Sequence, residues 1–364
     1  MKLSIVCLAK DEAANVAKLV TQLSRQTLLT GRALPNDLAN GLAGDLAADM
    51  SGNQSGAPAI DVLMVANGCN DDTAARTEAC RPMLAGLPHV SLTVHDLPQG
   101  GKSRSWNRAV HEFTDPASDY LLFLDADVDL LDDAVMADLL RRIAGDSKLR
   151  ALSGLPAKDA HGRQDKTLTE RLSLLISRNT RSSGSISGGL YIIRGAVARA
   201  IWLPNETPGE DGFLNAMVNT AGFSEPHAPG RVAEADRLTH YFETIPPRAF
   251  FGHERRLIVG TMVNRWIFEH LWSLKLAQPA GPLIAQWNAE RPQWIQDIID
   301  RNVAGKRWLI PREIVLRRFK GPKALGWLKF AAYLPLSILG TLMMLPAAIM
   351  ANGTLKRQGS SSVW

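Results

Sequence analysis

Short apolar runs and helix-spaced apolar residues alternate along roughly the first 130 residues of the chain. Residues Leu3 to Ala9 form an apolar run of strand length, and "DEAANVAKLVTQLSRQ" then places Val16, Leu19 and Leu23 on one face of a helix. Similar apolar runs recur in "DVLMVANG", "VSLTVHD" and "DYLLFLDAD". Strands that alternate with helices predict an α/β fold with a doubly wound, mostly parallel sheet of the Rossmann-like kind.

Polar clusters fall at the carboxyl ends of the predicted strands. They read "KDE", "NGCNDDT", "GGK" and "DAD" in chain order. Ligands of doubly wound sheets bind outside the carboxyl ends of the strands. We therefore expect the functional site at this edge of the sheet.

The pattern changes after residue 27 and again after residue 155. The segment 28–59 is rich in Gly, Ala, Asn and Asp and predicts an inserted surface loop. Further on, "SISGGLYIIRG" predicts a glycine turn into a short strand, and "PGEDGFL" predicts a helix that begins at Glu210 and Asp211. We expect an α/β domain over 1–245, a helical, basic and Trp-rich extension over 246–326, a membrane-associating segment over 327–352 and a polar tail over 353–364.

The segment from Phe330 to Ala351 contains no charged residue. Its length suffices for a helix that crosses a bilayer, which needs about 20 apolar residues. Because Pro335 and Pro346 would kink such a helix, a re-entrant or interfacial hairpin is an alternative, and a buried core helix is a third. Tryptophans and basic residues flank the segment, as at membrane interfaces. We expect a peripheral or single-pass protein at the cytoplasmic face of the cell membrane.

Charge and cysteine content narrow the class further. The formal net charge is +5, and the stretch from Arg301 to Lys329 holds nine Lys or Arg against one acid, Glu313. This basic stretch beside the apolar segment favours anionic lipid over nucleic acid as a partner. The three cysteines show no zinc-site spacing, which indicates a reducing compartment.

Two acids at the end of an apolar strand suggest a metal site. Asp125 and Asp127 follow the run "YLLFL". Carboxylates of this kind can hold Mg²⁺ or Mn²⁺ against the diphosphate of a sugar nucleotide, with Asp127 facing the metal and Asp125 facing the metal or the ribose. The alternative is a solvated strand end. Asp129, with Asp132 and Asp133, is expected to cap the next helix.

Five motifs in sequence order resemble those of the family-two glycosyltransferases, which are inverting enzymes of the GT-A fold. They are "LSIVCLAKDEAANVAKLV", "VANGCNDDTA", "GGKSRSWNRAV", "LFLDADV" and "PGEDGFL". The resemblance covers about the first 245 residues. It implies a GT-A fold, a nucleotide-sugar donor and Mn²⁺ or Mg²⁺ as cofactor.

The resemblance also implies roles for individual residues. Asp211 takes the position of the catalytic base, with Glu210 beside it to position the acceptor, although two acids at this point could instead cap a helix. Lys102 is expected at the donor diphosphate, with a plain solvated lysine as the alternative. Arg104 and Asn107 are weaker candidates that could simply hold the loop in place.

The nucleotide site departs from the family pattern, which usually has acids where Ala66 and Asn67 stand. Asn67 remains able to bond a base edge, whereas Asp71 could contact the nucleotide or cap a helix. His240 is a candidate metal ligand, ahead of His227 and His253, against the alternative of a packed histidine. Arg255 and Arg256 could bind a phosphate or lie on a helix surface.

These features predict a metal-dependent inverting glycosyltransferase of the hexosyltransferase type, acting at the membrane on a lipid, lipid-linked or polysaccharide acceptor. A nucleotidyltransferase is an alternative, but those enzymes usually have a glycine-rich, arginine-containing loop where this chain reads "AKDEAAN". A non-catalytic membrane adaptor is another, and the presence of all four acids, Asp125, Asp127, Glu210 and Asp211, counts against it.

Overall fold

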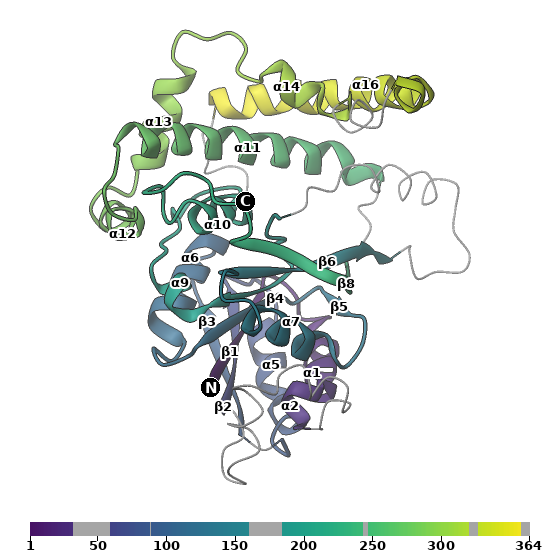
Figure 1. Cartoon of the computed structure of the whole chain (residues 1–364), viewed down its shortest axis with the longest axis vertical. Coiled ribbons are helices and arrows are strands. Elements are labelled where there is room, and N and C mark those ends of the chain that lie inside the picture. Colours follow the sequence, from purple (N-terminus) through teal and green to yellow (C-terminus); the bar gives the residue numbers. More distant parts are fainter. Residues whose placement is uncertain (32–58, 88, 160–183, 243–246, 320–326, 358–364) are drawn as a thin grey trace.

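The computed structural model describes residues 1–31, 59–87, 89–159, 184–242, 247–319 and 327–357 (Figure 1). Most of the predicted 28–59 loop and the end of the predicted polar tail lie outside these ranges. Within them, the chain forms one α/β layer structure with a helical layer along one side.

The sheet has eight strands in the order β3-β2-β1-β4-β7-β6-β8-β5. The strands are β1 (Lys2–Ala9), β2 (Ala59–Asn67), β3 (Val90–Leu97), β4 (Tyr120–Asp125), β5 (Asp129–Leu130), β6 (Ala151–Lys158), β7 (Leu190–Arg194) and β8 (Val232–Phe242). The neighbouring strands β3, β2, β1 and β4 are parallel to one another, whereas β7 pairs antiparallel with both β4 and β6. The predicted α/β architecture with a mostly parallel sheet is confirmed.

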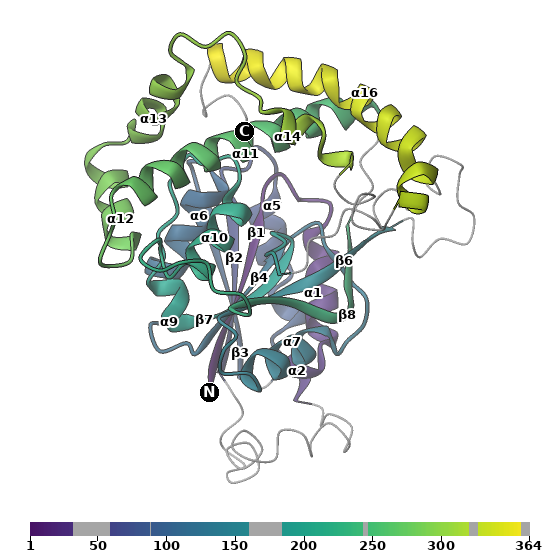
Figure 2. The ribbon, with the colours of Figure 1, turned by 45° about the horizontal axis from the view of Figure 1, so that its top comes forward.

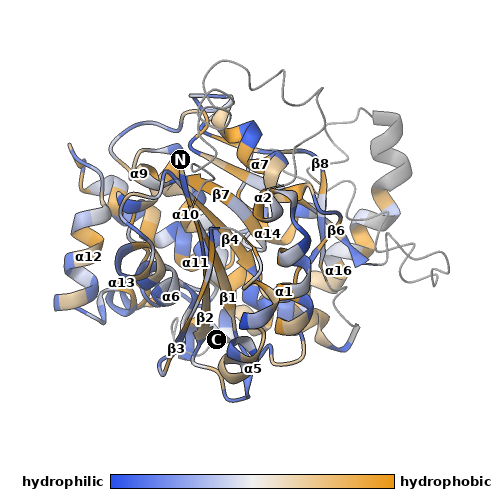
Figure 3. Ribbon diagram, turned by 90° about the horizontal axis from the view of Figure 1, so that it is seen from below, coloured by the Kyte–Doolittle hydropathy of each residue, from blue (hydrophilic) through white to orange (hydrophobic). Residues whose placement is uncertain are grey.

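Helices cover both faces of the sheet because the central strands are apolar on both sides. In β1, Leu3, Ile5 and Cys7 belong to one hydrophobic cluster, and Val6 and Leu8 belong to another on the opposite face. Figure 3 shows β1, β2 and β4 as hydrophobic strands between the helical layers. The sheet is therefore doubly wound, as predicted.

The helices of this part are α1 (Val16–Arg25), α2 (Thr27–Thr30), α5 (Thr73–Ala79), α6 (Lys102–Arg108), α7 (Val135–Ala144), α9 (Gly195–Arg199) and α10 (Glu210–Asn219), with the short 3-10 helix η1 (Arg81–Met83) and the short π-helix η2 (Ala109–Phe113). The cluster that contains Leu3 packs on α1 and α7, and the cluster that contains Val6 packs on α6, α9 and α10. Helix α10 begins at Glu210, as the sequence predicts.

The described residues after 246, namely 247–319 and 327–357, are mostly helical, as predicted. Its elements are η4 (Pro247–Ala249), α11 (Phe250–Ser273), α12 (Gly281–Glu290), α13 (Trp294–Val303), α14 (Arg312–Val315), η5 (Arg317–Phe319) and α16 (Trp327–Arg357). Helix α11 packs on α10, and its buried apolar residues share one hydrophobic cluster with the sheet, among them Ile258, Met262 and Ile267. The helical layer is therefore continuous with the core of the α/β part.

Helix α16 forms the outermost element of this layer (Figures 1 and 2). It runs through Pro335 and Pro346 as one helix of 31 residues, so the hairpin alternative is wrong. From Ser337 to Arg357 it is long and apolar enough to cross a membrane, judged by length and composition. Its buried residues pack on α11, and its opposite face is exposed.

Candidate active site

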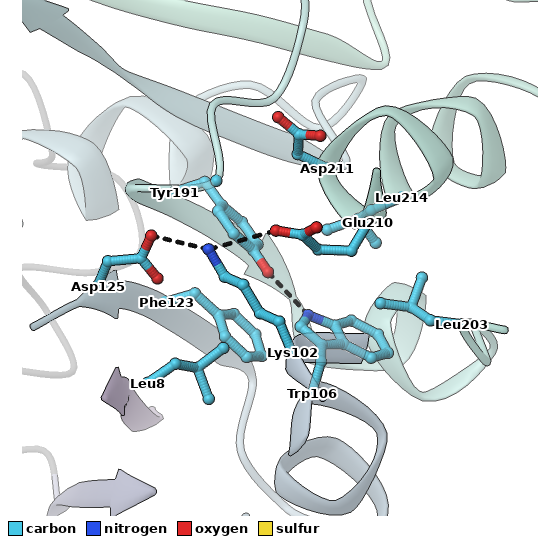
Figure 4. Close-up of a pocket in the computed structure, with 11 residues that line it drawn as sticks. Leu8, Lys102, Trp106, Phe123, Asp125, Tyr191, Leu203, Glu210, Asp211 and Leu214 are labelled. Carbon is cyan, nitrogen blue, oxygen red and sulfur yellow. Dashed lines mark hydrogen bonds and ion pairs between the residues drawn. The ribbon is translucent and has the colours of Figure 1, made fainter. Parts of the chain in front are cut away.

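Several elements bring polar side chains to one pocket at the carboxyl end of β4. The pocket is lined by Leu8, Lys102, Trp106, Phe123, Asp125, Gly188, Tyr191, Leu203, Glu210, Asp211 and Leu214 (Figure 4). Asp125 ends β4, Lys102 opens α6, and Glu210 and Asp211 open α10. The fold thus joins three of the predicted motifs, which lie up to 109 positions apart in the sequence.

Lys102 lies between two carboxylates (Figure 4). Its Nζ is 2.7 Å from Oδ2 of Asp125 and 3.3 Å from Oε1 of Glu210. Burial acts to lower the pKa of Lys102, but the charges of Asp125 and Glu210 raise it by more, so that it stands well above its usual range. The ammonium is therefore charged at any physiological pH and links the end of β4 to the start of α10.

The two pocket aspartates are held in surroundings that favour protonation. Burial raises the pKa of Asp125 to about 6, against the opposing effect of Lys102. Burial and the neighbouring charge of Glu210 raise the pKa of Asp211, although the backbone N–H of Gly212 donates to its Oδ1 at 2.7 Å. A carboxylate with a raised pKa is a better proton acceptor near neutral pH than an ordinary aspartate.

Three aromatic side chains, which the sequence pattern does not predict, line the pocket beside these charged groups. Trp106 Nε1 donates a hydrogen bond of 2.7 Å to the hydroxyl of Tyr191. Phe123 stacks on Tyr191 with ring centroids 5.0 Å apart and on Trp106 at 5.7 Å. These residues come from α6, β4 and β7, so only the tertiary fold brings them together.

The side chain of Asn67 holds the neighbouring loop in place through hydrogen bonds. Its Oδ1 accepts hydrogen bonds of 2.8 Å from the N–H of Gly101 and from the hydroxyl of Ser105. The turn is tight, because a Cβ on Gly68, which has φ +59°, would lie 2.5 Å from the nitrogen of Gly100. The side chain that was predicted at a base edge thus uses its oxygen to shape the turn before α6.

Arg104 and Asn107 hold loops in place, in line with the alternative stated for them. Arg104 Nη1 donates to the carbonyl of Gly100 at 2.8 Å. Asn107 bonds both the N–H and the carbonyl of Leu203, each at 2.8 Å, and so fixes the segment that leads into α10.

Asp71 is engaged in the loops after β1 and β2. Its carboxylate accepts from the N–H of Ala13 at 3.1 Å and from the N–H of Thr73 at 3.0 Å, and the hydroxyl of Thr73 is the main cause of its lowered pKa. These bonds favour the helix-start alternative over nucleotide contact. Together with Asp11 and Cys69 it places three possible metal-ligand atoms within 4.8 Å of one another, a grouping that the sequence pattern does not predict.

Asp127 and His240 lie near the end of β4. Asp127 is exposed just beyond Asp125, whose N–H donates to the carbonyl of Gly189 at 2.9 Å. His240 is buried, which lowers its pKa to about 4, so its imidazole is neutral. Its Nδ1 bonds the hydroxyl of Thr239 at 2.9 Å, and its Nε2 faces Gly189. A neutral imidazole anchored through one nitrogen suits metal ligation and also suits packing.

The remaining candidates lie apart from the lining of the pocket. His227 is exposed. His253, Arg255 and Arg256 are on α11, where Arg255 Nη1 lies 3.5 Å from the hydroxyl of Thr354 in α16. Arg255 therefore belongs to the contact between α11 and α16.

The predicted helix cap after β4 is largely wrong. Asp129 lies in β5 opposite Tyr241 and forms an ion pair with Lys18. Asp132 alone accepts a hydrogen bond at the start of α7, from the N–H of Ala134 at 3.0 Å. The short strand β5 intervenes because Asp129 and Leu130 pair with β8, which the local sequence does not reveal.

Comparisons with known proteins give structural likenesses only. No protein-family model and no curated protein matches the chain. It is similar to mannosyltransferase PcManGT from Pyrobaculum calidifontis in complex with GDP-Man and Mn²⁺, with 14% identity over 96% of this chain and 86% of that chain and a TM-score of 0.48. It is similar to S. aureus TarS 1-349 in complex with UDP, with 15% identity over 98% and 90% and a TM-score of 0.42.

A third likeness is to glucosyl-3-phosphoglycerate synthase from Mycobacterium tuberculosis in complex with Mn²⁺, UDP-Glc and phosphoglyceric acid. The identity is 14% over 72% of this chain and 79% of that chain, with a TM-score of 0.45. One fold hosts many activities, so the activity of this chain has to follow from its own site residues.

Proposed function

We propose that the protein is a metal-dependent inverting glycosyltransferase that uses a nucleotide-sugar donor. The observation that carries the proposal is the joining of Asp125, Lys102, Glu210 and Asp211 around one pocket at the carboxyl edge of the sheet. Two of these acids have raised pKa values, which is typical of functional sites.

The charge of the site suits a divalent cation. The carboxylates of Asp125, Glu210 and Asp211 lie near the ammonium of Lys102. Asp127 lies close enough to Asp125 for its charge to raise the pKa of Asp125. Asp127 and Asp125 would hold Mn²⁺ or Mg²⁺, with His240 as a candidate third ligand, and the cation would neutralise charge on the departing diphosphate. Lys102 would add a positive charge on the same side.

Asp211 would act as the general base. The acceptor hydroxyl attacks the anomeric carbon, a new C–O bond forms, the bond to the nucleoside diphosphate breaks, and the hydroxyl proton passes to Asp211. Glu210 is tied to Lys102 and would hold the acceptor or the neighbouring carboxylate in position. Attack from the face opposite the diphosphate inverts the anomeric configuration.

The acceptor would be a lipid, a lipid-linked sugar or a polysaccharide at the cytoplasmic face of the membrane. The long apolar helix α16 and the basic residues beside it support this placement. The soluble donor would reach the pocket from the cytosol.

A donor screen tests the proposal. Thermal unfolding would be measured with Mn²⁺ and UDP-, GDP-, dTDP- or CDP-sugars. We expect one nucleotide class to stabilise the protein, since a ligand at about 100 times its Kd adds about 2.7 kcal/mol. Asp127→Ala should lose the response, whereas Asp129→Ala, a nearby acid that pairs with Lys18, should keep it. If no donor stabilises the wild type, or if Asp127→Ala responds like the wild type, the donor site is not there.

A further inference from the structure

Helix α16 carries large apolar side chains on the face that points away from the protein. These side chains, between 39% and 61% exposed, are Ile338, Leu339, Leu342, Met343, Leu345, Ile349 and Met350. The opposite face packs inward through Met344, Ala347, Ala348, Ala351 and Leu355, all at most 2% exposed. At 100° per residue the two sets occupy opposite sides of the helix.

We propose that this outer face of α16 docks on an anionic lipid bilayer, with the helix lying in the plane of the interface. A helix built for the core of a soluble protein has no need of seven large apolar side chains in water. Exposed apolar surface of this extent marks an interaction site. Helices that lie in an interface bury one apolar face among the lipid headgroups and acyl chains.

The packing of α16 opposes a crossing orientation. The helix lies against α11 and does not extend away from the protein (Figures 1 and 2). Helix α11 exposes the ion pair of Arg265 and Glu269, whose side chains are more than half exposed. If α16 crossed the bilayer, α11 beside it would bring these charges into hydrocarbon at high cost. An in-plane helix keeps α11 on the water side.

Basic side chains beside the apolar face supply the charge that an anionic surface requires. Lys306, Arg307, Arg312, Lys356 and Arg357 are all exposed. Asn352 joins their two segments, because its Oδ1 accepts from the N–H of Leu309 at 2.8 Å. Within the described residues 301–319 and 352–357, Glu313 is the only acid. Each basic residue near an anionic bilayer strengthens binding severalfold.

A shallow groove continues the apolar surface beyond α16. It is lined by Trp308, Leu309, Ile310, Pro311, Arg312, Val315 and Leu316. Trp308 and Leu316 are nearly half exposed, and the indole N–H of Trp308 is satisfied by the carbonyl of Ile310. Tryptophan beside arginine is typical of a membrane interface.

The docked orientation deepens the proposed function, and it rests on that function only for the nature of the acceptor. The α/β part and its pocket stay on the water side of the helical layer. A lipid-borne acceptor is thereby presented to an enzyme held at the headgroup level. Binding itself requires neither donor nor transfer, so the two can fail separately.

Vesicle flotation without donor sugar tests the docking face. Purified full-length protein should float with phosphatidylcholine vesicles that contain about one third phosphatidylglycerol, and more weakly with phosphatidylcholine alone. Leu342→Gln with Ile349→Gln should weaken binding at least about tenfold. The control, Met83→Gln with Leu274→Gln, removes two exposed apolar side chains elsewhere and should bind like the wild type.

The basic residues are tested in the same assay. Lys356→Gln with Arg357→Gln should lower binding to the anionic vesicles by roughly tenfold and leave binding to neutral vesicles unchanged. Arg25→Gln with Lys148→Gln removes the same charge from exposed positions elsewhere and should have little effect.

Protease protection separates the in-plane helix from a crossing one. With tags placed before Met1 and after Trp364, protease added to inverted membrane vesicles should remove both. Protection of the second tag would show a crossing helix and overturn the proposal. Failure of the wild type to float would also overturn the proposal. So would a wild-type dimer that dissociates in the Leu342→Gln with Ile349→Gln variant while flotation stays unchanged, because the face would then bind a second copy of the chain.

Discussion

Aspartate has three different surroundings at the carboxyl edge of this sheet, and each indicates a different use. Asp71 is exposed, and the hydroxyl of Thr73 together with the N–H groups of Ala13 and Thr73 lowers its pKa. Asp127 is exposed next to the end of β4 and is available to a cation. Asp125 and Asp211 are partly buried in the pocket, and this burial raises their pKa values. Residue type alone does not separate these uses; the surroundings do.

Replacing Asp211 by Asn should remove the base while leaving the donor site intact. We expect kcat to fall by roughly 10²–10⁴-fold, the usual contribution of general base catalysis. In the wild type, kcat/KM should decrease toward acid pH at a higher pH than an ordinary aspartate would give, because the base must be deprotonated and burial raises its pKa. Rate measurements from pH 5 to 8 check this, and turnover that survives the substitution would remove Asp211 from the mechanism.

Replacing Lys102 by Gln should destabilise the protein more at pH 8 than at pH 5. The folded-state pKa of Asp125 is about 6, above its ordinary value, so its contribution to stability is lost as pH rises through 6. Lys102 opposes the rise in the pKa of Asp125, so without Lys102 this pKa is higher and the loss of stability at high pH is larger. The melting temperature should fall by a few degrees at pH 8 and by less at pH 5.

The control for this substitution is Lys18→Gln. Lys18 pairs with Asp129 at the surface, where both side chains are well exposed, so its removal should have little effect at either pH. An equal loss at both pH values in Lys102→Gln would mean that the lysine contributes by packing alone.

At the scale of elements, the turn between β3 and α6 depends on a residue of another strand. Asn67 at the end of β2 holds Gly101 and Ser105, and this cross-strand support fixes where Lys102 stands. Loop backbones that bind phosphate work best when they are held in advance of binding.

Replacing Asn67 by Ala should therefore reduce both stability and donor affinity. The buried hydroxyl of Ser105 and the part-buried N–H of Gly101 lose their acceptor, at a cost of about 1–3 kcal/mol in the free energy of unfolding. Denaturant titration and donor binding would measure the two effects. Asn67→Asp keeps an acceptor oxygen and should retain more of both. Asn302→Ala removes a helix-surface amide of α13 and should leave donor affinity unchanged.

The pattern of apolar residues predicted the strands that are buried as continuous apolar runs and the helix that packs one apolar face on the sheet. Strands β1, β2 and β4 and helix α1 follow from apolar runs and helical spacing. Strands β5, β6 and β8 were not predicted, because β6 and β8 pair with a register shift across some 80 residues and carry no regular alternation. The link of Asp125 to Glu210 through Lys102 likewise depends on distant contacts.

At the scale of the whole molecule, α16 has two roles because its two faces differ. The inner face completes the hydrophobic cluster that runs from the sheet through α11. Removing the helix would therefore expose core, and loss of membrane binding after such a deletion would not distinguish unfolding from undocking. Substitutions on one face at a time make that distinction.

A carboxylate placed on either face of α16 should give opposite results. Ala351 is fully buried and Met350 beside it is 43% exposed. Ala351→Asp puts a charge into the hydrophobic cluster that joins α16 to α11 and should lower the free energy of unfolding by several kcal/mol, which a denaturant titration would detect. Met350→Asp should change it by less than about 0.5 kcal/mol and yet weaken vesicle binding. If Ala351→Asp proved as stable as Met350→Asp, α16 would not pack on α11 in solution, and its membrane orientation would be free of that constraint.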